Sequence, residues 1–199
     1  MKIIQNSNGI VLGGNTQKIL IKLRMERFKA DSILFELPQY NGQEDDLDGI
    51  WNDKEGYLDY CINTLDSALA MLPNGNAAIC FNDKYSDFIL SFDDFPDKIG
   101  ITEKTFCGRY LNHNILIYST NKSEKITYPS NLEFNALLDG FDRFKVFYNI
   151  FVACCPENGI ILDLCAKDNT ARDTAKYLNR NYLGIEENIW NLKQIEKAG

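Results

Sequence analysis

Apolar residues along the chain follow two alternating patterns. Short, nearly continuous apolar runs have the length and composition of strands that are buried on both faces. The segments between them place apolar residues three and four positions apart, which puts these residues on one face of a helix. Strands are expected at 10–12, 32–35, 77–81, 114–119, 160–164 and 182–185, and helices at 17–25, 55–71, 143–155, 170–178 and 189–197. This alternation predicts an α/β fold with a Rossmann-like, doubly wound, mostly parallel sheet and helices on both faces.

The pattern gives no sign of a second domain. The 199 residues suit one domain with a full core, and no internal repeat or low-complexity segment interrupts them. Residues 83–112 are the least regular part of the chain and are interpreted as a reduced or variable insert. We therefore expect residues 1–199 to form a single domain.

Composition narrows the possible functions. The chain is 45% hydrophobic and 25% charged, which is ordinary for a globular protein. No apolar run approaches the ~20 residues of a membrane span, and the first residues lack a secretory apolar core, so we expect a cytoplasmic protein without membrane contact. The net charge of −7 disfavours DNA as a partner, because phosphate backbones are bound mainly by Lys and Arg. The six cysteines include no C-x-x-C pair and are interpreted as reduced thiols.

Two further features are interpreted as structural. The acidic loop at 44–55 approximates a calcium-binding EF-hand loop, but Glu44 at its first position and the strand and proline before it favour a solvated loop. The sole histidine, His113, precedes an apolar strand. No metal is therefore expected.

The segment 160–186 carries the most information about function. It reads as a strand, a helix and a second strand that ends in the acidic residue Glu186, which is how a Rossmann-type fold holds the ribose of a nucleotide-like cofactor. The turn after the first strand is C-A-K-D-N at 165–169, where such a fold uses glycines to bring its backbone close to the ligand. The sequence thus predicts the frame of a cofactor site without its glycine turn.

Taken in order, several segments resemble the amino-group DNA methyltransferases, which methylate adenine N6 or cytosine N4 with S-adenosylmethionine. The matching segments are the strand end at 12–15, F-E-L-P-Q-Y-N at 35–41 in place of D-P-P-Y-N, the helix and turn Y-L-D-Y…L-P-N-G at 57–75, the strand at 113–118, and the closing segment at 162–186. The resemblance implies a seven-stranded sheet of the S-adenosylmethionine-dependent type. It also implies a circularly permuted order, with the catalytic segment before the cofactor segment.

The resemblance implies a degenerate catalytic motif at Glu36, Leu37, Pro38 and Tyr40. In the family, the target base is flipped out and stacked on an aromatic ring, while the motif's carboxylate accepts a hydrogen bond from the amino group. Aligned on Tyr40, the carboxylate position is Leu37, which accepts no hydrogen bond. A shift by one residue offers Glu36 but moves the aromatic ring out of register.

The resemblance also implies a degenerate cofactor site. Its positions are Asp163, Cys165, Lys167, Asn169 and Glu186. Lys167 and Asn169 stand where the family has glycines, and we expect the long Lys167 side chain to fill the cofactor pocket.

A third position points in the same direction, since Gly14 replaces the family's acidic residue while the packing segment 57–75 is kept. We therefore expect a methyltransferase-like protein without catalytic activity or a bound cofactor. Its partner would be a protein, either an active methyltransferase or a component of a restriction or phage-defence system. Two alternatives stay open: an active, divergent S-adenosylmethionine-dependent enzyme that uses Glu36, and a nucleic-acid-binding module. The second would use Tyr40 and the basic cluster Lys18, Lys22, Arg24, Arg27 and Lys29.

Overall fold

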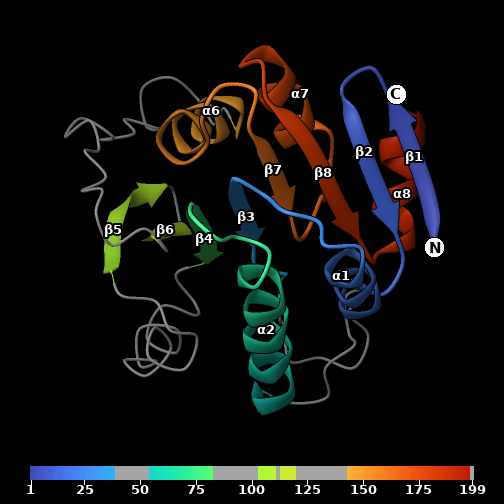
Figure 1. Cartoon of the computed structure of the whole chain (residues 1–199), viewed down its shortest axis with the longest axis horizontal. Coiled ribbons are helices and arrows are strands. Elements are labelled where there is room, and N and C mark those ends of the chain that lie inside the picture. The colour runs from blue at the N-terminus through green and yellow to red at the C-terminus, as the bar shows by residue number, and fades with distance from the viewer. Residues whose placement is uncertain (39–53, 83–102, 111–112, 120–142, 198–199) are drawn as a thin grey trace.

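The computed structural model describes residues 1–38, 54–82, 103–110, 113–119 and 143–197. Its strands are β1 (Lys2–Asn6), β2 (Gly9–Gly13), β3 (Ser32–Glu36), β4 (Asn76–Asn82), β5 (Glu103–Tyr110), β6 (His113–Ser119), β7 (Ile160–Asp163) and β8 (Asn181–Glu186). Its helices are α1 (Thr16–Met25), α2 (Lys54–Leu69), α6 (Arg143–Cys154), α7 (Thr170–Tyr177) and α8 (Ile189–Lys197). Strands and helices alternate in the described parts as the apolar pattern predicts (Figure 1).

All described strands join one eight-stranded sheet in the order β1-β2-β8-β7-β3-β4-β6-β5. The pairs from β2 through β8, β7 and β3 to β4 are parallel, whereas β1 and β6 pair antiparallel with their neighbours. The expected count of seven strands is wrong by one. Two strands lie outside the six predicted ranges: β1, which forms an antiparallel hairpin with β2 at one edge of the sheet, and β5, which pairs with β6 at the other.

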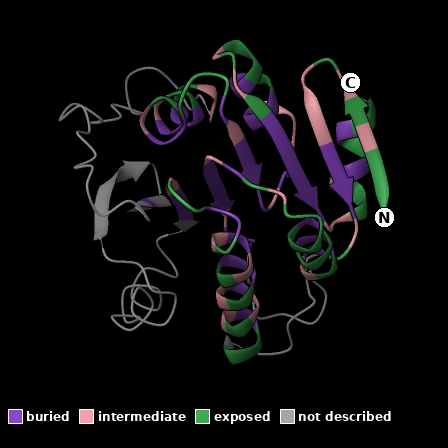
Figure 2. Cartoon of the chain, in the orientation of Figure 1, coloured by how far each residue is buried: buried purple, intermediate pink, exposed green. Residues whose placement is uncertain are grey.

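Two helical layers cover the sheet. One apolar core joins the sheet to α1 and α2, and a second joins the opposite face to α6, α7 and α8. Figure 2 shows the central strands almost entirely buried between these layers. The doubly wound, mostly parallel architecture is therefore confirmed. No helix in the described ranges is long and apolar enough to span a membrane.

In the middle of the sheet, the direction in which successive strands are added reverses. The unit β7-α7-β8 runs toward one edge, and the unit β3-α2-β4 runs toward the other, while β3 and β7 pair directly in parallel. Folds of this kind place their ligands beyond the carboxyl ends of the two strands at such a switch point. Here those ends carry both the predicted catalytic segment and the predicted cofactor turn, and we call this region the switch point.

The predicted insert at 83–112 is described only in part. Residues 103–110 form β5, which pairs with β6 through a register shift between Phe106 and Gly108. Residues 83–102 lie outside the described ranges.

Candidate functional site at the switch point

The pleat of β3 decides which predicted catalytic residue faces the switch point. Phe35 and Leu37 both belong to the core beneath α1 and α2. Side chains alternate between the faces of a strand, so Glu36 projects to the opposite side. The Leu37 backbone N–H donates to Cys80 O at 2.8 Å, and Pro38 is buried, its carbonyl accepting from Tyr57 Oη at 2.9 Å. Leu37 and Pro38 are thus packing residues, and Glu36 supplies the only carboxylate of the described motif residues 36–38.

Both oxygens of Glu36 are held by cations. Its Oε1 lies 3.3 Å from Lys167 Nζ, and its Oε2 lies 2.6 Å from Arg143 Nη2. Arg143 also pairs through Nη1 with Asp168 and lies 5.2 Å from the centroid of the Phe147 ring. The Glu36 side chain is only 15% exposed, and those of Lys167 and Arg143 are 24% exposed. We call these four charged residues, Glu36, Arg143, Lys167 and Asp168, the switch-point ion cluster.

The pKa of Lys167 shows how strongly this cluster stabilises a charged side chain. Burial lowers the pKa of its ammonium group. The charge and hydrogen bond of Glu36 raise this pKa by a larger amount, so it lies above its ordinary value. Lys167 is therefore a charged group at neutral pH, tied to the end of β3. Its side chain bridges the two strands between which a switch-point ligand would lie.

The turn at 165–169 adopts a backbone that needs no glycine. Asn169 has φ −84° and ψ −5°, which any residue can take, and none of the described residues with positive φ falls in this turn. Asn169 precedes α7 without a capping side-chain bond, and its buried Oδ1 has no hydrogen-bond partner. Burial raises the pKa of the neighbouring Cys165 thiol well above its ordinary value.

Asp163 ends β7 beneath this turn and is 2% exposed. Its Oδ2 accepts from Tyr182 Oη at 2.7 Å and its Oδ1 from the Cys165 N–H at 3.0 Å. Burial raises the pKa of Asp163 to about 7, although these two hydrogen bonds act in the opposite direction. Burial and the adjacent Asp163 charge together raise the pKa of Tyr182. Asp163 is thus a buried acid whose oxygens are already satisfied by the protein.

Glu186, the predicted ribose ligand, is also buried, with 2% exposure. Its Oε1 accepts from the Asn188 N–H at 2.6 Å, and its Oε2 accepts from Asn191 Nδ2 at 3.2 Å. The carboxylate is therefore bonded to both sides of the start of α8, while the helix itself is capped by Asn188 Oδ1, which accepts from the Trp190 and Asn191 N–H groups. Gly14, with φ +141°, donates its N–H to Glu186 O at 3.0 Å.

Two residues of this region were missed by sequence reasoning. Glu187 accepts from Asn15 Nδ2 at 2.7 Å, from the Thr16 N–H at 3.2 Å and from Tyr60 Oη at 3.3 Å, which fastens β8 to the start of α1. The apolar pattern places Arg143 in a helix and gives it no further role. Its position in the first turn of α6 was a usable signal, because the helix dipole disfavours a cation there unless a carboxylate compensates.

Other predicted features lie partly or wholly outside the described residues. Tyr40 and most of the acidic loop at 44–55 fall in the range 39–53, and the side chain of His113 is not described. The side chains of five cysteines are described, and all five are free thiols. Within the described ranges, no group of His, Cys, Asp or Glu side chains is placed to hold a metal ion.

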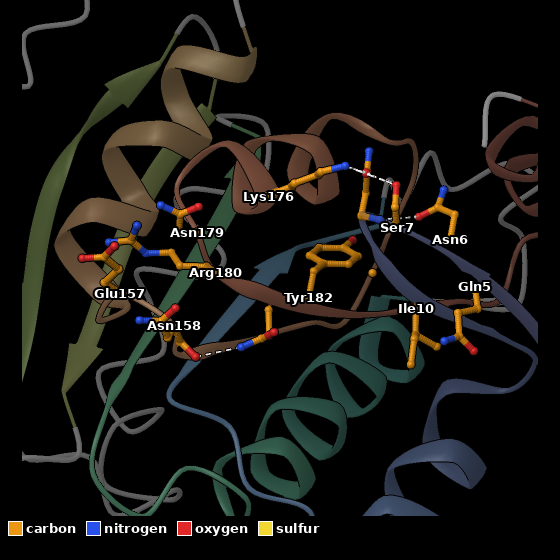
Figure 3. A pocket seen from close by; sticks show the side chains of 13 residues that line it. Gln5, Asn6, Ser7, Ile10, Glu157, Asn158, Lys176, Asn179, Arg180 and Tyr182 are labelled. Carbon is orange, nitrogen blue, oxygen red and sulfur yellow. Dashed lines mark hydrogen bonds between the residues drawn. The ribbon is translucent and has the colours of Figure 1, made fainter.

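A further cavity lies away from the switch point. It measures about 570 Å³ and lies at the amino end of β8, between the β1–β2 turn, the end of α7 and the loop before β7 (Figure 3). Its lining is rich in asparagine, and Lys176 crosses it to donate to Ser7 Oγ at 3.2 Å and to Asn8 Oδ1. Sequence reasoning did not predict this groove.

The fold is shared with solved structures of DNA methyltransferases. M1.HpyAVI in complex with SAM matches with a TM-score of 0.67 at 16% identity, covering 94% of this chain and 97% of that one. TTHA0409 from Thermus thermophilus, named as a candidate DNA modification methylase, gives 0.64 at 14% identity, covering 94% and 92%. The cytosine-N4-specific PvuII DNA methyltransferase gives 0.64 at 15% identity, covering 92% and 83%. Comparison of the sequence finds no matching family model and no matching curated protein.

These likenesses, at 14–16% identity, establish the fold as that of the amino-group DNA methyltransferases. The segment 35–41 precedes the segment 160–186, so the chain has the permuted order. The resemblance predicted from the motifs is therefore confirmed at the level of the fold.

Proposed function

We propose that this chain is a methyltransferase-like protein that does not transfer methyl groups and that acts through contacts with another protein. The switch-point ion cluster is the observation that carries the proposal. Lys167 and Arg143 lie at 3.3 Å and 2.6 Å from the two oxygens of Glu36, between the strand ends that flank the ligand site of this fold class. A ligand entering there would have to separate these ion pairs.

Charge and hydrogen bonding both oppose the methylation reaction at this place. A base amino group becomes more nucleophilic when a carboxylate accepts its hydrogen bond, but both Glu36 oxygens already accept from cations. The sulfonium of S-adenosylmethionine is itself a cation, and the carboxylates of Glu36 and Asp168 that could attract it are already neutralised by Lys167 and Arg143. The residues present therefore do not fit the cofactor or the reaction.

The acids that could remain for the cofactor are committed elsewhere. Asp163 is bonded to Tyr182 and to its own turn, and Glu186 is bonded to the first residues of α8. Breaking such buried hydrogen bonds without replacing them costs about 1–3 kcal/mol for each group. Binding of S-adenosylmethionine would have to overcome this cost in addition to the ion cluster.

Titration calorimetry with S-adenosylmethionine tests the inactive part of the proposal. We expect no heat of binding with the wild-type chain, that is, a Kd above about 1 mM. A Kd in the micromolar range, or methyl transfer from labelled S-adenosylmethionine to DNA, would sink it. The double variant Lys167→Gly with Asn169→Gly restores the family's glycines, and a gain of affinity in this variant alone locates the obstruction at the turn.

The part of the proposal that concerns protein contacts is supported by an aromatic surface on α6 and α7. Phe144, Tyr148 and Tyr177 contact one another, with ring centroids 5.5–6.5 Å apart, and Tyr177 is 69% exposed. Tyrosine is enriched among the residues that dominate binding at protein interfaces. Tyr177→Ala should weaken binding of an active amino-group DNA methyltransferase measured by biolayer interferometry, and unchanged binding would remove this surface from the proposal.

One observation favours a second candidate, an active divergent enzyme. Glu36, not Leu37, reaches the switch point, so a carboxylate is present near the place where the family needs one. This enzyme would transfer methyl groups to DNA, and Glu36→Gln would abolish the transfer. Absence of transfer by the wild-type chain eliminates this candidate.

The nucleic-acid-binding alternative can be tested on five exposed cations of α1 and the residues just after it. They are Lys18, Lys22, Arg24, Arg27 and Lys29. Lys22 lies 3.9 Å from Glu26, and the chain as a whole carries −7. Binding to DNA through these cations would fall steeply with added salt. Lack of binding even at low salt removes the alternative.

A further inference from the structure

The strand β1 ends the described sheet and leaves one backbone edge without a neighbouring strand (Figure 1). It pairs with β2 on its other side in an unbroken register from Lys2↔Gly13 to Asn6↔Gly9. Such an edge presents backbone N–H and C=O groups in the geometry that another strand would use. A protein that stays monomeric blocks it with a bulge, a proline or a charge.

The two edges of this sheet differ in that protection. The opposite edge strand, β5, carries a register irregularity between Phe106 and Gly108, and its sequence E-K-T-F-C-G-R-Y is rich in charge. The sequence of β1 is K-I-I-Q-N, with no proline and one charge, and its register has no bulge. That charge, Lys2, is drawn toward α8 by Glu196 at 2.6 Å.

The side chains of β1 also leave apolar surface uncovered. Ile3 lies beside Leu12 of β2, on the face covered by α1 and α2, yet Ile3 is 59% exposed whereas Leu12 is 8% exposed. Ile4 points to the other face, where it packs against the core beneath α8. The apolar row on the α1 face therefore continues past β2 and ends at Ile3.

The composition of β1 makes it complementary to itself. In an antiparallel pair of two β1 strands centred on Ile4, Ile4 of one copy lies opposite Ile4 of the other, and Ile3 lies opposite Gln5. Lys2 lies opposite Asn6, so the single charge of the strand meets a neutral amide and no like charges oppose each other. We propose that a second copy of this chain adds to the sheet at β1 in this antiparallel arrangement, forming a dimer with a two-fold axis at Ile4.

Sedimentation equilibrium over a dilution series tests the dimer. The wild-type chain should approach twice its 22.8 kDa mass as its concentration rises. Ile3→Lys adds a charge to each of the two Ile3–Gln5 pairs that flank the central Ile4 pair, and it should leave only the monomer mass. Val152→Lys, the same change at an exposed aliphatic residue of α6, is the matched control and should dimerise as the wild type does. Circular dichroism verifies that both variants are folded.

A charge-pair variant tests the register. The double variant Ile3→Glu with Gln5→Lys places opposite charges across both pairs formed by positions 3 and 5 and should dimerise. The double variant Ile3→Lys with Gln5→Lys places like charges there and should stay monomeric. A wild-type chain that stays monomeric at every concentration, or a dimer lost in Val152→Lys and kept in Ile3→Lys, would overturn the proposal.

Discussion

Glu36→Gln is the substitution that most directly tests the switch-point ion cluster. It keeps the shape of the side chain and removes its charge, so Lys167 and Arg143 lose the carboxylate that they share. Arg143 retains Asp168, whereas the described bonds of Lys167 include no second carboxylate. The variant therefore leaves a poorly compensated cation between β3 and β7.

The expected cost lies between two measured extremes. Removing one partner of a fully buried ion pair costs about 3–5 kcal/mol, whereas an exposed pair contributes about 0–1 kcal/mol. Glu36 is 15% exposed and each cation is 24% exposed, so water screens the pair in part. Discounting for this exposure and for the remaining Asp168, we expect Glu36→Gln to lower the free energy of unfolding by about 2–3 kcal/mol.

Urea denaturation at neutral pH and low salt measures this loss. At about 2–4 °C per kcal/mol for a chain of this size, the melting temperature should fall by about 4–12 °C. Glu196→Gln is the matched control, because it removes one charge from the exposed pair with Lys2, whose side chains are 46% and 53% exposed. The control should change stability by less than about 1 kcal/mol. A Glu36→Gln loss no larger than that of the control would refute the reasoning.

Three further predictions concern the strands beneath the turn at 165–169. The folded-state pKa of Asp163, about 7, lies above its ordinary value of 3.8, because the folded protein favours the protonated side chain. This preference contributes fully to the free energy of unfolding below pH 3.8, and the contribution is lost as the pH rises through 7. Asp163→Asn should abolish this loss. Between about pH 4 and pH 8, the free energy of unfolding of the variant should therefore rise by up to about 4 kcal/mol relative to that of the wild type, as measured by urea denaturation at each pH. Tyr182→Phe removes a donor to Asp163 and should move the same pH dependence upward, and an unmoved profile would contradict it. Gly184→Ala would place a Cβ 2.7 Å from Ala166 Cβ and 2.8 Å from Tyr182 Oη, so urea denaturation should show a loss of about 1–3 kcal/mol.

The apolar pattern predicted the central strands and the helices because their burial leaves a local signature. In α2, for example, Tyr57, Cys61, Leu65 and Ala68 recur on one face and are all buried. The strand β1 was not predicted, because it lies at an edge and only two of its five residues are apolar. Its pairing with β2 comes from the hairpin turn and not from alternation along the strand.

The sequence predicted those residues of the candidate site that lie inside a motif, and it missed those that lie outside one. The sequence identified Lys167 as the residue that departs from the glycine turn, and the structure places its ammonium group beside Glu36. It did not identify Arg143, which is 107 positions away from Glu36. Nor could it choose between Glu36 and Leu37, because that choice depends on the pleat at the last residue of β3.

These departures from the motif depend on one another electrostatically. A lysine in the turn after β7 loses solvation, and Glu36 is the described carboxylate that offsets this loss. Arg143 begins α6, where the helix dipole opposes a cation, and it depends on Glu36 and Asp168 in the same way. Glu36 is thus the structural partner of Lys167, and the adjacent Leu37 packs in the core. Lys167 and Glu36 are therefore coupled: removing Glu36 would leave Lys167 without its described carboxylate, whereas removing Lys167 would leave Glu36 paired with Arg143.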